Sequence, residues 1–359
     1  MEQVLQLYQQ WLAQQPLKGD KQWLLSQRFA VEYNYNSNHI EGNTLTYGQT
    51  ELLLLFGKVS GNGNLKDFAD MKASAVGVKM IEEAVNDKAI PLTQNFIRQL
   101  HKIILREDYT VYRNLPGGGT TSYTIHAGQY KTRPNSVITR YGDRFEYASP
   151  EETPTLMTDL VDWFNEAEAS GKYTPVELAA LFHYRYIRIH PFEDGNGRIV
   201  RLMVNYILAR HDWPMIVVRN RNKADYLEAL HKSDMEIGTK PSDGAKATLR
   251  QARHFVKYFS QTVAMELNYL IDFAKEESNE VWWYDGQRIT FRSKSTSKLL
   301  YAMRYDEEIT LKDLAATAGI NISAVKAQIS TLTGKNYIRR NDEGNWMVMI
   351  CPSVELEEY

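Results

Sequence analysis

A short glycine-rich stretch between two segments with helical periodicity constrains this chain more than any other feature. It runs from His190 to Arg198 and reads His-Pro-Phe-Glu-Asp-Gly-Asn-Gly-Arg. Residues 175–189 before it carry apolar side chains at helical spacing, and residues 199–208 after it form one apolar face of a second helix. The stretch is therefore predicted to be a tight turn that opens onto the N-terminus of the second helix.

The turn has the composition of an anion-binding site. Backbone N–H groups at the start of a helix have no partner within the helix, and the helix dipole favours negative charge there. Gly195 and Gly197 let the backbone come close to an anion. Arg198 and Arg201 lie about one helical turn apart and can hold phosphate oxygens. These residue types predict a polyphosphate site.

Two more side chains of the turn could take part in chemistry. Asp194 is a hard oxygen ligand, suited to Mg²⁺ bridging two phosphates. His190 can be neutral near pH 7 and take a proton from an attacking hydroxyl. The alternative is an ordinary helix–helix turn with solvated charges. That alternative explains neither Asn196 nor the paired arginines.

Residues 190–198 resemble the signature of the Fic-domain family, His-x-Phe-x-Asp/Glu-Gly-Asn-Gly/Lys-Arg, and match each of its fixed positions. Arg201 matches a second arginine that often follows it. Members typically move AMP from ATP onto a Ser, Thr or Tyr hydroxyl of a protein. The resemblance implies a mainly α fold, with a Fic-type helical core and a small β-hairpin flap. It also implies ATP as the substrate and Mg²⁺ or Mn²⁺ as the metal.

The same resemblance implies a role for each residue of the turn. His190 would be the catalytic base that deprotonates the target hydroxyl, and Asp194 would hold the metal. The implied nucleotide-binding residues are Gly195, Asn196, Gly197, Arg198, Arg201 and Tyr226.

A second motif, Ser37-Asn38-His39-Ile40-Glu41-Gly42, resembles the inhibitory pattern of the same family, Ser/Thr-x-x-x-Glu-Gly/Asn. A serine and a glutamate at this spacing are common, and usually cap a helix or lie in a polar loop. In the resembling proteins the glutamate pairs with the second arginine, here Arg201, and occupies the place of the γ-phosphate. The resemblance thus implies autoinhibition by Ser37 and Glu41. Some inhibited members also remove AMP with this glutamate, and the sequence leaves open whether Glu41 does so.

Residues 127–147 are predicted to form a β-hairpin, because two short β-prone runs flank the turn at Tyr141-Gly142-Asp143. In the resembling family a hairpin here is a flap, and an exposed strand edge can hold a target as an added strand. Lys131, Val137 and Ile138 are the expected target-docking residues. Lys131 stands where the family commonly has Arg. An ordinary surface hairpin is the alternative.

The C-terminal part differs from the rest of the chain in the order of its expected helices and strands and in its local charge. Within residues 298–350 a helix, a turn at Gly319, a second helix and a β-hairpin are expected, which is the order of a winged helix. Residues 291–340 carry nine Lys/Arg and four Asp/Glu, yet residues 323–332 offer few side chains that read DNA. The sequence leaves open whether this domain binds DNA or protein. A DNA-binding regulator that uses the nucleotide pocket as a sensor is therefore the alternative to a transferase.

Three consecutive domains are predicted. Residues 1–90 would be a helical region with the inhibitory motif, residues 91–275 the Fic catalytic core, and residues 285–359 the winged-helix-like domain. The apolar run 52–56 is expected to be a buried helix.

Composition fits an enzyme of the cytoplasm. The net charge of −2 does not call for nucleic acid or anionic lipid, and the single cysteine, Cys351, excludes an internal disulfide. No apolar run is long enough for a membrane span, and the first residues lack the pattern of a signal peptide. The expected partner is a protein that carries the modified hydroxyl, and the chain itself is a second candidate target. The sequence does not decide whether the protein is a homodimer.

Overall fold

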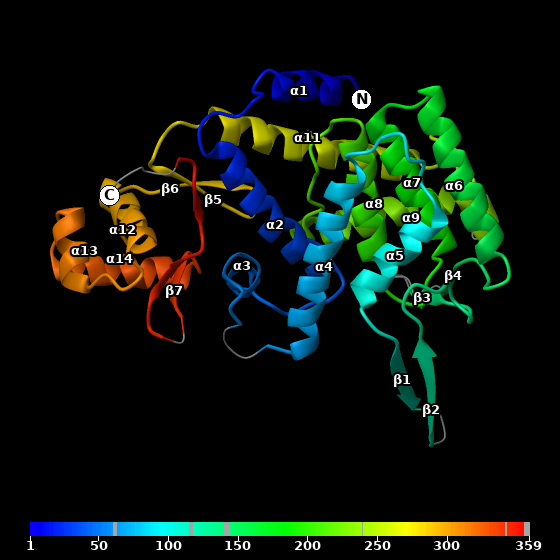
Figure 1. The fold of residues 1–359 in the computed structure, drawn as a ribbon, viewed down its shortest axis with the longest axis horizontal. Coiled ribbons are helices and arrows are strands. Elements are labelled where there is room, and N and C mark those ends of the chain that lie inside the picture. Colours follow the sequence, from blue (N-terminus) through cyan, green and yellow to red (C-terminus); the bar gives the residue numbers. More distant parts are fainter. Residues whose placement is uncertain are drawn as a thin grey trace. The chain divides into compact units, whose positions relative to one another are not determined.

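The computed structural model describes residues 1–59, 63–114, 118–138, 142, 144–238, 240–341 and 343–354. The fold is mainly helical with short antiparallel strand pairs (Figure 1), which confirms the predicted fold class. In the described part of the chain, none of the helices combines the length and the apolar character that a membrane span requires.

The first compact unit comprises Met1, Asn36–Asn43 and Ala69–Ala264. Two antiparallel hairpins belong to it, β1 (Tyr109–Asn114) with β2 (Thr120–Ile125) and β3 (Ser136–Ile138) with β4 (Arg144–Glu146). Its helices are the end of α2 (Lys21–Ile40), most of α4 (Leu65–Ala84), α5 (Gln94–Leu105), α6 (Thr153–Ser170), α7 (Pro175–Ile189), α8 (Asn196–Arg210), η1 (Asn220–Asn222), α9 (Lys223–Ile237), α10 (Pro241–Ala245) and the first half of α11 (Arg253–Lys275).

Helices α7 and α8 pack against each other in the core of this unit, and both are buried along most of their length. Thr174 and Glu177 form a capping box at the start of α7, and Pro175 occupies its first turn. The helix ends at His190, whose φ of 52° lies in the left-handed region. Gly195, with φ of 78°, then caps α8. These local signals fix the sharp turn between the helices, as the sequence predicted.

The second compact unit comprises Glu2–Tyr35, Thr44–Phe68 and the chain from Met265 onward. Its helices and strands are α1 (Glu2–Leu12), most of α2, α3 (Tyr47–Phe56), the end of α11, β5 (Val281–Tyr284), β6 (Gln287–Thr290), α12 (Lys294–Tyr305), α13 (Leu311–Ala318), α14 (Ile322–Gly334), β7 (Ile338–Arg340), β8 (Trp346–Val348) and β9 (Cys351–Pro352). The strands form a three-stranded sheet in the order β6-β5-β9 and a β7–β8 hairpin.

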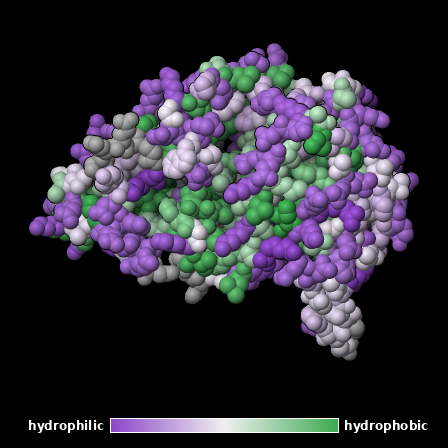
Figure 2. Space-filling view, viewed as in Figure 1, coloured by the Kyte–Doolittle hydropathy of each residue, from purple (hydrophilic) through white to green (hydrophobic). Residues whose placement is uncertain are grey.

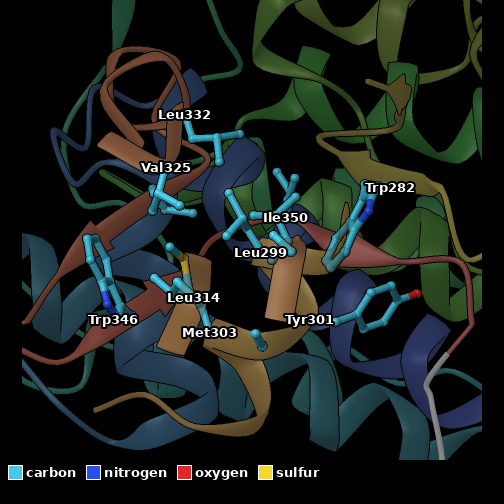
Figure 3. Close-up of a cluster of buried hydrophobic side chains, with 13 residues drawn as sticks. Trp282, Leu299, Tyr301, Met303, Leu314, Val325, Leu332, Trp346 and Ile350 are labelled. Carbon is cyan, nitrogen blue, oxygen red and sulfur yellow. The ribbon is translucent and has the colours of Figure 1, made fainter. Parts of the chain in front are cut away.

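Buried side chains of α12, α13, α14 and the nearby strands form one core in this unit (Figure 3). Leu299, Leu314, Val325 and Trp346 lie within it, together with Trp282 from β5. The helices and the hairpin follow one another in the order predicted for a winged helix. Asp342, within the predicted hairpin turn, lies outside the described residues.

The two units differ from the three consecutive domains that the sequence predicts. Each unit is assembled from separate segments of the chain, because α2, α4 and α11 each contribute residues to both. The predicted N-terminal domain, residues 1–90, is therefore divided between the units.

Candidate active site

The turn between α7 and α8 is braced from within by Asn196. The Phe192 N–H donates to Asn196 Oδ1 at 3.0 Å, and Asn196 Nδ2 donates to the Phe192 carbonyl at 2.7 Å. The Asn196 side chain is buried. The side chain therefore holds the turn together, and the backbone N–H of Asn196 is the group left to face an anion at the helix start.

His101 of α5 supports the same turn from outside. Its ring stacks on Phe192 with centroids 3.7 Å apart and an interplanar angle of 4°. Nδ1 accepts the Gly128 N–H at 2.8 Å, so the neutral ring carries its proton on Nε2, which lies 3.0 Å from the Asp194 carbonyl. Burial lowers the pKa of His101 to about 4, which keeps the ring neutral. His101 is buried, and it holds the turn in place.

His190 stacks on Tyr147, with ring centroids 3.9 Å apart and an interplanar angle of 11°. Burial and the nearby Lys131 cation lower the pKa of His190 to about 3. The imidazole is therefore neutral near pH 7, which is the form that accepts a proton.

Lys131 lies beside the His190 turn. Its side chain is buried, and its ammonium donates to Asn135 Oδ1 at 2.8 Å and to the Ile189 carbonyl at 3.0 Å. Its backbone N–H donates to the Pro191 carbonyl at 2.9 Å. Burial lowers the pKa of Lys131 to about 7. The side chain thus supports the His190 turn. Its part in target docking stays a prediction.

Asp194 is partly exposed at the start of α8 and lies among polar groups. Oδ1 accepts the Gly195 N–H at 2.7 Å, and Oδ2 accepts the Tyr109 hydroxyl at 2.8 Å. Arg198 Nη2 lies 3.6 Å from Oδ2, and its Nη1 lies 3.6 Å from Asp70 Oδ2 on α4. Tyr109 comes from β1 and was not predicted, because nothing in its local sequence sets it apart from other strand tyrosines.

The Arg201 guanidinium is bound by the predicted inhibitory motif. Nη2 donates to Glu41 Oε1 at 2.6 Å and to the Ser37 carbonyl at 2.8 Å, while Nε donates to Ser37 Oγ at 3.0 Å. Gly197 lies directly beneath this contact, because a Cβ built on it would collide with the Glu41 carboxylate. The two motifs that the sequence identified are therefore in direct contact.

The start of α9 holds the segment that carries Glu41. Lys223 Nζ donates to the carbonyl of Ile40, the last residue of α2, at 2.7 Å. The Asn220 N–H donates to Asn36 Oδ1 at 2.8 Å. A cation at a helix C-terminus also interacts favourably with the helix dipole. These contacts fix the end of α2 beside Arg201.

Tyr226 is 5% exposed and lies in an aromatic cluster. Its contact with a nucleotide stays a prediction. Its hydroxyl is 3.0 Å from His183 Nε2, and its ring lies close to Phe255 and Tyr258. Helices α7 and α11 supply these neighbours, so the burial of Tyr226 depends on contacts between distant segments.

The predicted flap is present as β3 and β4, which pair from Ser136↔Glu146 to Ile138↔Arg144. Val137 is exposed on it, as a target-docking residue would be. The side chain of Ile138 and the turn residues Tyr141 and Asp143 lie outside the described residues.

A second hairpin, β1–β2, precedes the flap and was not predicted. Its two strands pair from Tyr109↔Ile125 to Asn114↔Thr120. It extends from the helices of its unit in Figure 1, and its visible face is coloured white to pale purple in Figure 2. Its first residue, Tyr109, reaches Asp194.

The donor set fits a metal that brings its own phosphate ligands. Among the described residues there is no group of three or more His, Cys, Asp or Glu that could hold a metal. Mg²⁺ needs only one or two protein carboxylates when substrate phosphates and water complete its shell. The partly exposed Asp194 carboxylate next to the start of α8 meets that requirement.

Comparison with known proteins agrees with this geometry. A model of the Fic/DOC family matches residues 91–208. The crystal structure of a Fic-domain-containing signaling protein from Bacteroides thetaiotaomicron is 53% identical, covers 77% of this chain and 98% of that one, and superposes with a TM-score of 0.71. The chain belongs to the Fic/DOC family.

Curated Fic relatives match it at greater distance. The protein adenylyltransferase fic-1 of Caenorhabditis briggsae is 27% identical over 249 residues, which are 69% of this chain and 43% of that protein. The chain therefore spans less than half the length of this relative. A structure of Fic-1 from Caenorhabditis elegans is 23% identical, covers 77% of this chain and 73% of that one, and has a TM-score of 0.59, so it shares the Fic fold.

Proposed function

We propose that this protein transfers AMP from ATP to a hydroxyl group of a protein, and that Glu41 holds it in an inhibited state. The observation that carries the proposal is the contact of Glu41 with Arg201 beside a turn that holds a neutral His190 and an accessible Asp194. The name of the C. briggsae relative, protein adenylyltransferase, supports the transfer of AMP. The 53% identity to a Fic-domain protein supports the same class of active site.

In the proposed reaction the target oxygen forms a bond to the α-phosphorus. The bond from that phosphorus to the oxygen bridging to the β-phosphate breaks, and pyrophosphate leaves. His190 takes the proton of the attacking hydroxyl, since its imidazole is neutral. Backbone N–H groups at the start of α8, with Gly195 and Gly197, would bind phosphate oxygens.

Asp194 would hold Mg²⁺, which supplies positive charge that offsets the phosphates. The hydrogen bond from Tyr109 fixes the orientation of this carboxylate. Arg198 lies beside Asp194, and we assign it to the outer phosphates together with Arg201.

Inhibition in this proposal is a competition of anions for Arg201. A guanidinium binds carboxylate and phosphate by the same charge-assisted hydrogen bonds, so Glu41 and a phosphate exclude each other there. With Glu41 in place, ATP cannot take the position from which the α-phosphorus is attacked. Removal of AMP from a modified target is a further reaction that we assign to Glu41, whose carboxylate is partly exposed and can orient a water molecule.

The test is to incubate purified Glu41→Gly protein with Mg²⁺ and ATP labelled at either the α- or the γ-phosphate, with a cell lysate as a source of targets. The proposal predicts label on protein from the α position alone, and none in the Glu41→Gly, His190→Ala double variant. Label from the γ position alone would make the protein a phosphotransferase. Absence of label from both positions would favour a regulator that senses nucleotide without transferring it.

A further inference from the structure

One face of the β1–β2 hairpin continues outward from the Fic turn. Directly opposite residues of an antiparallel pair share a face, and every second residue of a strand returns to it, so Tyr109 and Arg113 of β1 share a face with Tyr123 of β2. Tyr109 donates to Asp194 of the turn at 2.8 Å. The hairpin then extends away from the helices of its unit (Figure 1). Side chains farther along this face are therefore placed to meet a target whose hydroxyl lies at the turn.

Two arginines lie against the Tyr123 ring on this face. Arg113 Cζ is 5.2 Å from the ring centroid, and Arg133 Cζ is 3.8 Å from it. Both distances are those of cation–π contacts. Arg113 belongs to the hairpin, whereas Arg133 belongs to the segment that leads into the flap. We call Arg113, Tyr123 and Arg133 the arginine cluster.

The arginine cluster is linked to the Fic turn from two sides. Thr132, the residue before Arg133, donates to Glu193 Oε1 from its N–H at 3.2 Å and from its hydroxyl at 3.1 Å. Glu193 directly precedes Asp194 in the turn. The hairpin side of the cluster is linked to the turn by the hydrogen bond from Tyr109 to Asp194. These links fix the cluster relative to the candidate reacting groups.

The cluster carries two positive charges without a paired carboxylate. Both arginines are exposed, and neither Arg113 nor Arg133 has an ion pair or a hydrogen bond with another described residue. Glu193, the carboxylate nearest to Arg133 through Thr132, accepts two hydrogen bonds from Thr132 instead. Holding two like charges against one ring is unfavourable, and an anionic partner would offset that cost. The charge that complements the cluster is therefore negative.

The rest of the hairpin surface is mostly polar and uncharged. Apart from Tyr112 and Arg113, the exposed side chains of its two strands are short hydrogen-bonding groups, namely Thr110, Asn114, Thr120, Thr121 and Ser122. Its face visible in Figure 2 accordingly shows no green patch of hydrophobic residues. Recognition on such a surface depends on charge and hydrogen bonds more than on burial of apolar area.

We propose that the arginine cluster binds an acidic segment of the target protein, next to the hydroxyl that receives AMP. This inference rests on the proposed transfer of AMP, and it names the class of target. Tyr109 and Arg113 are four positions apart on one strand, which corresponds to about 13 Å. An extended target segment covers that length in about four residues, so its acidic side chains should begin roughly that far from the hydroxyl.

The test uses a synthetic peptide with Ser-Thr-Tyr at its centre, flanked on both sides by a glycine spacer and a run of glutamates. Its counterpart carries glutamines in place of the glutamates. Fluorescence anisotropy of the labelled peptides measures binding to the full chain without ATP. The glutamate peptide should bind about tenfold more tightly than the glutamine peptide, because two exposed ion pairs contribute about threefold each. The difference should shrink as salt is added.

Arg113→Gln and Arg133→Gln should each weaken binding of the glutamate peptide about threefold, and the double variant about tenfold. Lys172→Gln is the matched control, because Lys172 is also an exposed cation, 5.4 Å from the Tyr173 ring centroid. Lys172 precedes α7, a helix of 15 residues that ends at the Fic turn, so it lies about 20 Å from the turn. The control should bind the glutamate peptide as the wild-type protein does.

The proposal would be overturned by equal binding of the two peptides, by no binding of either, or by unchanged binding in the double variant. Tighter binding of a single-stranded RNA oligonucleotide than of the glutamate peptide would also overturn it, since the cluster would then be a phosphate site. A thermal melt of each variant separates lost binding from lost folding. Anisotropy without ATP does not depend on AMP transfer, so a failure of docking is distinguished from a failure of the proposed function.

Discussion

Glu41 accepts a hydrogen bond from Arg201 at 2.6 Å although 160 positions separate them in the chain. The Arg201 side chain is 1% exposed, whereas that of Glu41 is 40% exposed. Ser37 accepts two more hydrogen bonds from the same guanidinium and keeps it in place. A fixed, buried arginine with a partly exposed carboxylate is suited to exchange of one anion for another, because an incoming phosphate can replace Glu41 and leave Arg201 paired.

The pH dependence of transfer should reflect the low pKa of His190. An exposed histidine loses its base form as the pH falls through about 6.5. Burial and Lys131 lower the pKa of His190 to about 3, so its base form persists at lower pH. Rates of the Glu41→Gly protein between about pH 8 and about pH 5.5 should therefore show no loss centred near 6.5. A loss centred there would mean that His190 titrates as an exposed group.

Lys223→Met should raise transfer by the otherwise intact protein. The variant removes the hydrogen bond to the Ile40 carbonyl and a cation at the end of α2, together worth about 1 kcal/mol, or roughly fivefold in the fraction with Glu41 displaced. Lys232→Met, on the exposed side of the same helix α9, is the matched control. In the Glu41→Gly background Lys223→Met should not change the rate of transfer further. A rise in that rate equal to the one in the otherwise intact protein would assign Lys223 another role.

Tyr109→Phe should raise the Mg²⁺ concentration needed for half-maximal transfer by about tenfold, because the variant loses the hydrogen bond that orients the Asp194 carboxylate. Tyr112→Phe is the matched control, since Tyr112 lies on the same strand and is exposed. Titration of Mg²⁺ at saturating ATP measures the effect. Equal metal dependence of the two variants would show that the Tyr109 hydroxyl does not act through Asp194.

Gly195→Ala should destabilise the fold more than Gly171→Ala does. Both glycines have φ in the left-handed region, 78° and 62°, so both variants are strained. Only at position 195 would the new Cβ also meet a neighbour, 2.9 Å from Leu105 Cδ1, whereas position 171 is open. The additional loss is on the order of 1–2 kcal/mol. Thermal melts of the two variants measure the difference. Equal melting midpoints would show that the turn relaxes around the methyl group added at position 195.

The parts of the fold that were predictable are those that local sequence encodes. Thr93, a residue type typical of a helix start, caps α5, and its hydroxyl accepts the Phe96 N–H. The turn between α7 and α8 follows from helical periodicity on both sides and from Gly195. The contact of Glu41 with Arg201 was reached only through the resemblance to the Fic family, since spacing alone does not join motifs so far apart.

The parts that were missed depend on packing between distant segments. Tyr109 of β1 meets Asp194, which lies 85 positions away, and the buried Lys131 ammonium donates to the carbonyl of Ile189, 58 positions away. Tyr226 is enclosed by rings from α7 and α11. None of these side chains carries a local signal of its surroundings. The compact units also depend on packing between distant segments, because α2, α4 and α11 each contribute residues to both.

The central claim, that Glu41 blocks AMP transfer by occupying Arg201, is tested most directly by comparing the rates of wild-type and Glu41→Gly protein. The measurement is incorporation of α-labelled ATP into protein at equal protein, Mg²⁺ and ATP concentrations. The Glu41→Gly protein should transfer AMP at a rate roughly tenfold or more above the wild-type rate, the equivalent of about 1.4 kcal/mol. A rate for Glu41→Gly that is equal to or below the wild-type rate would contradict the central claim.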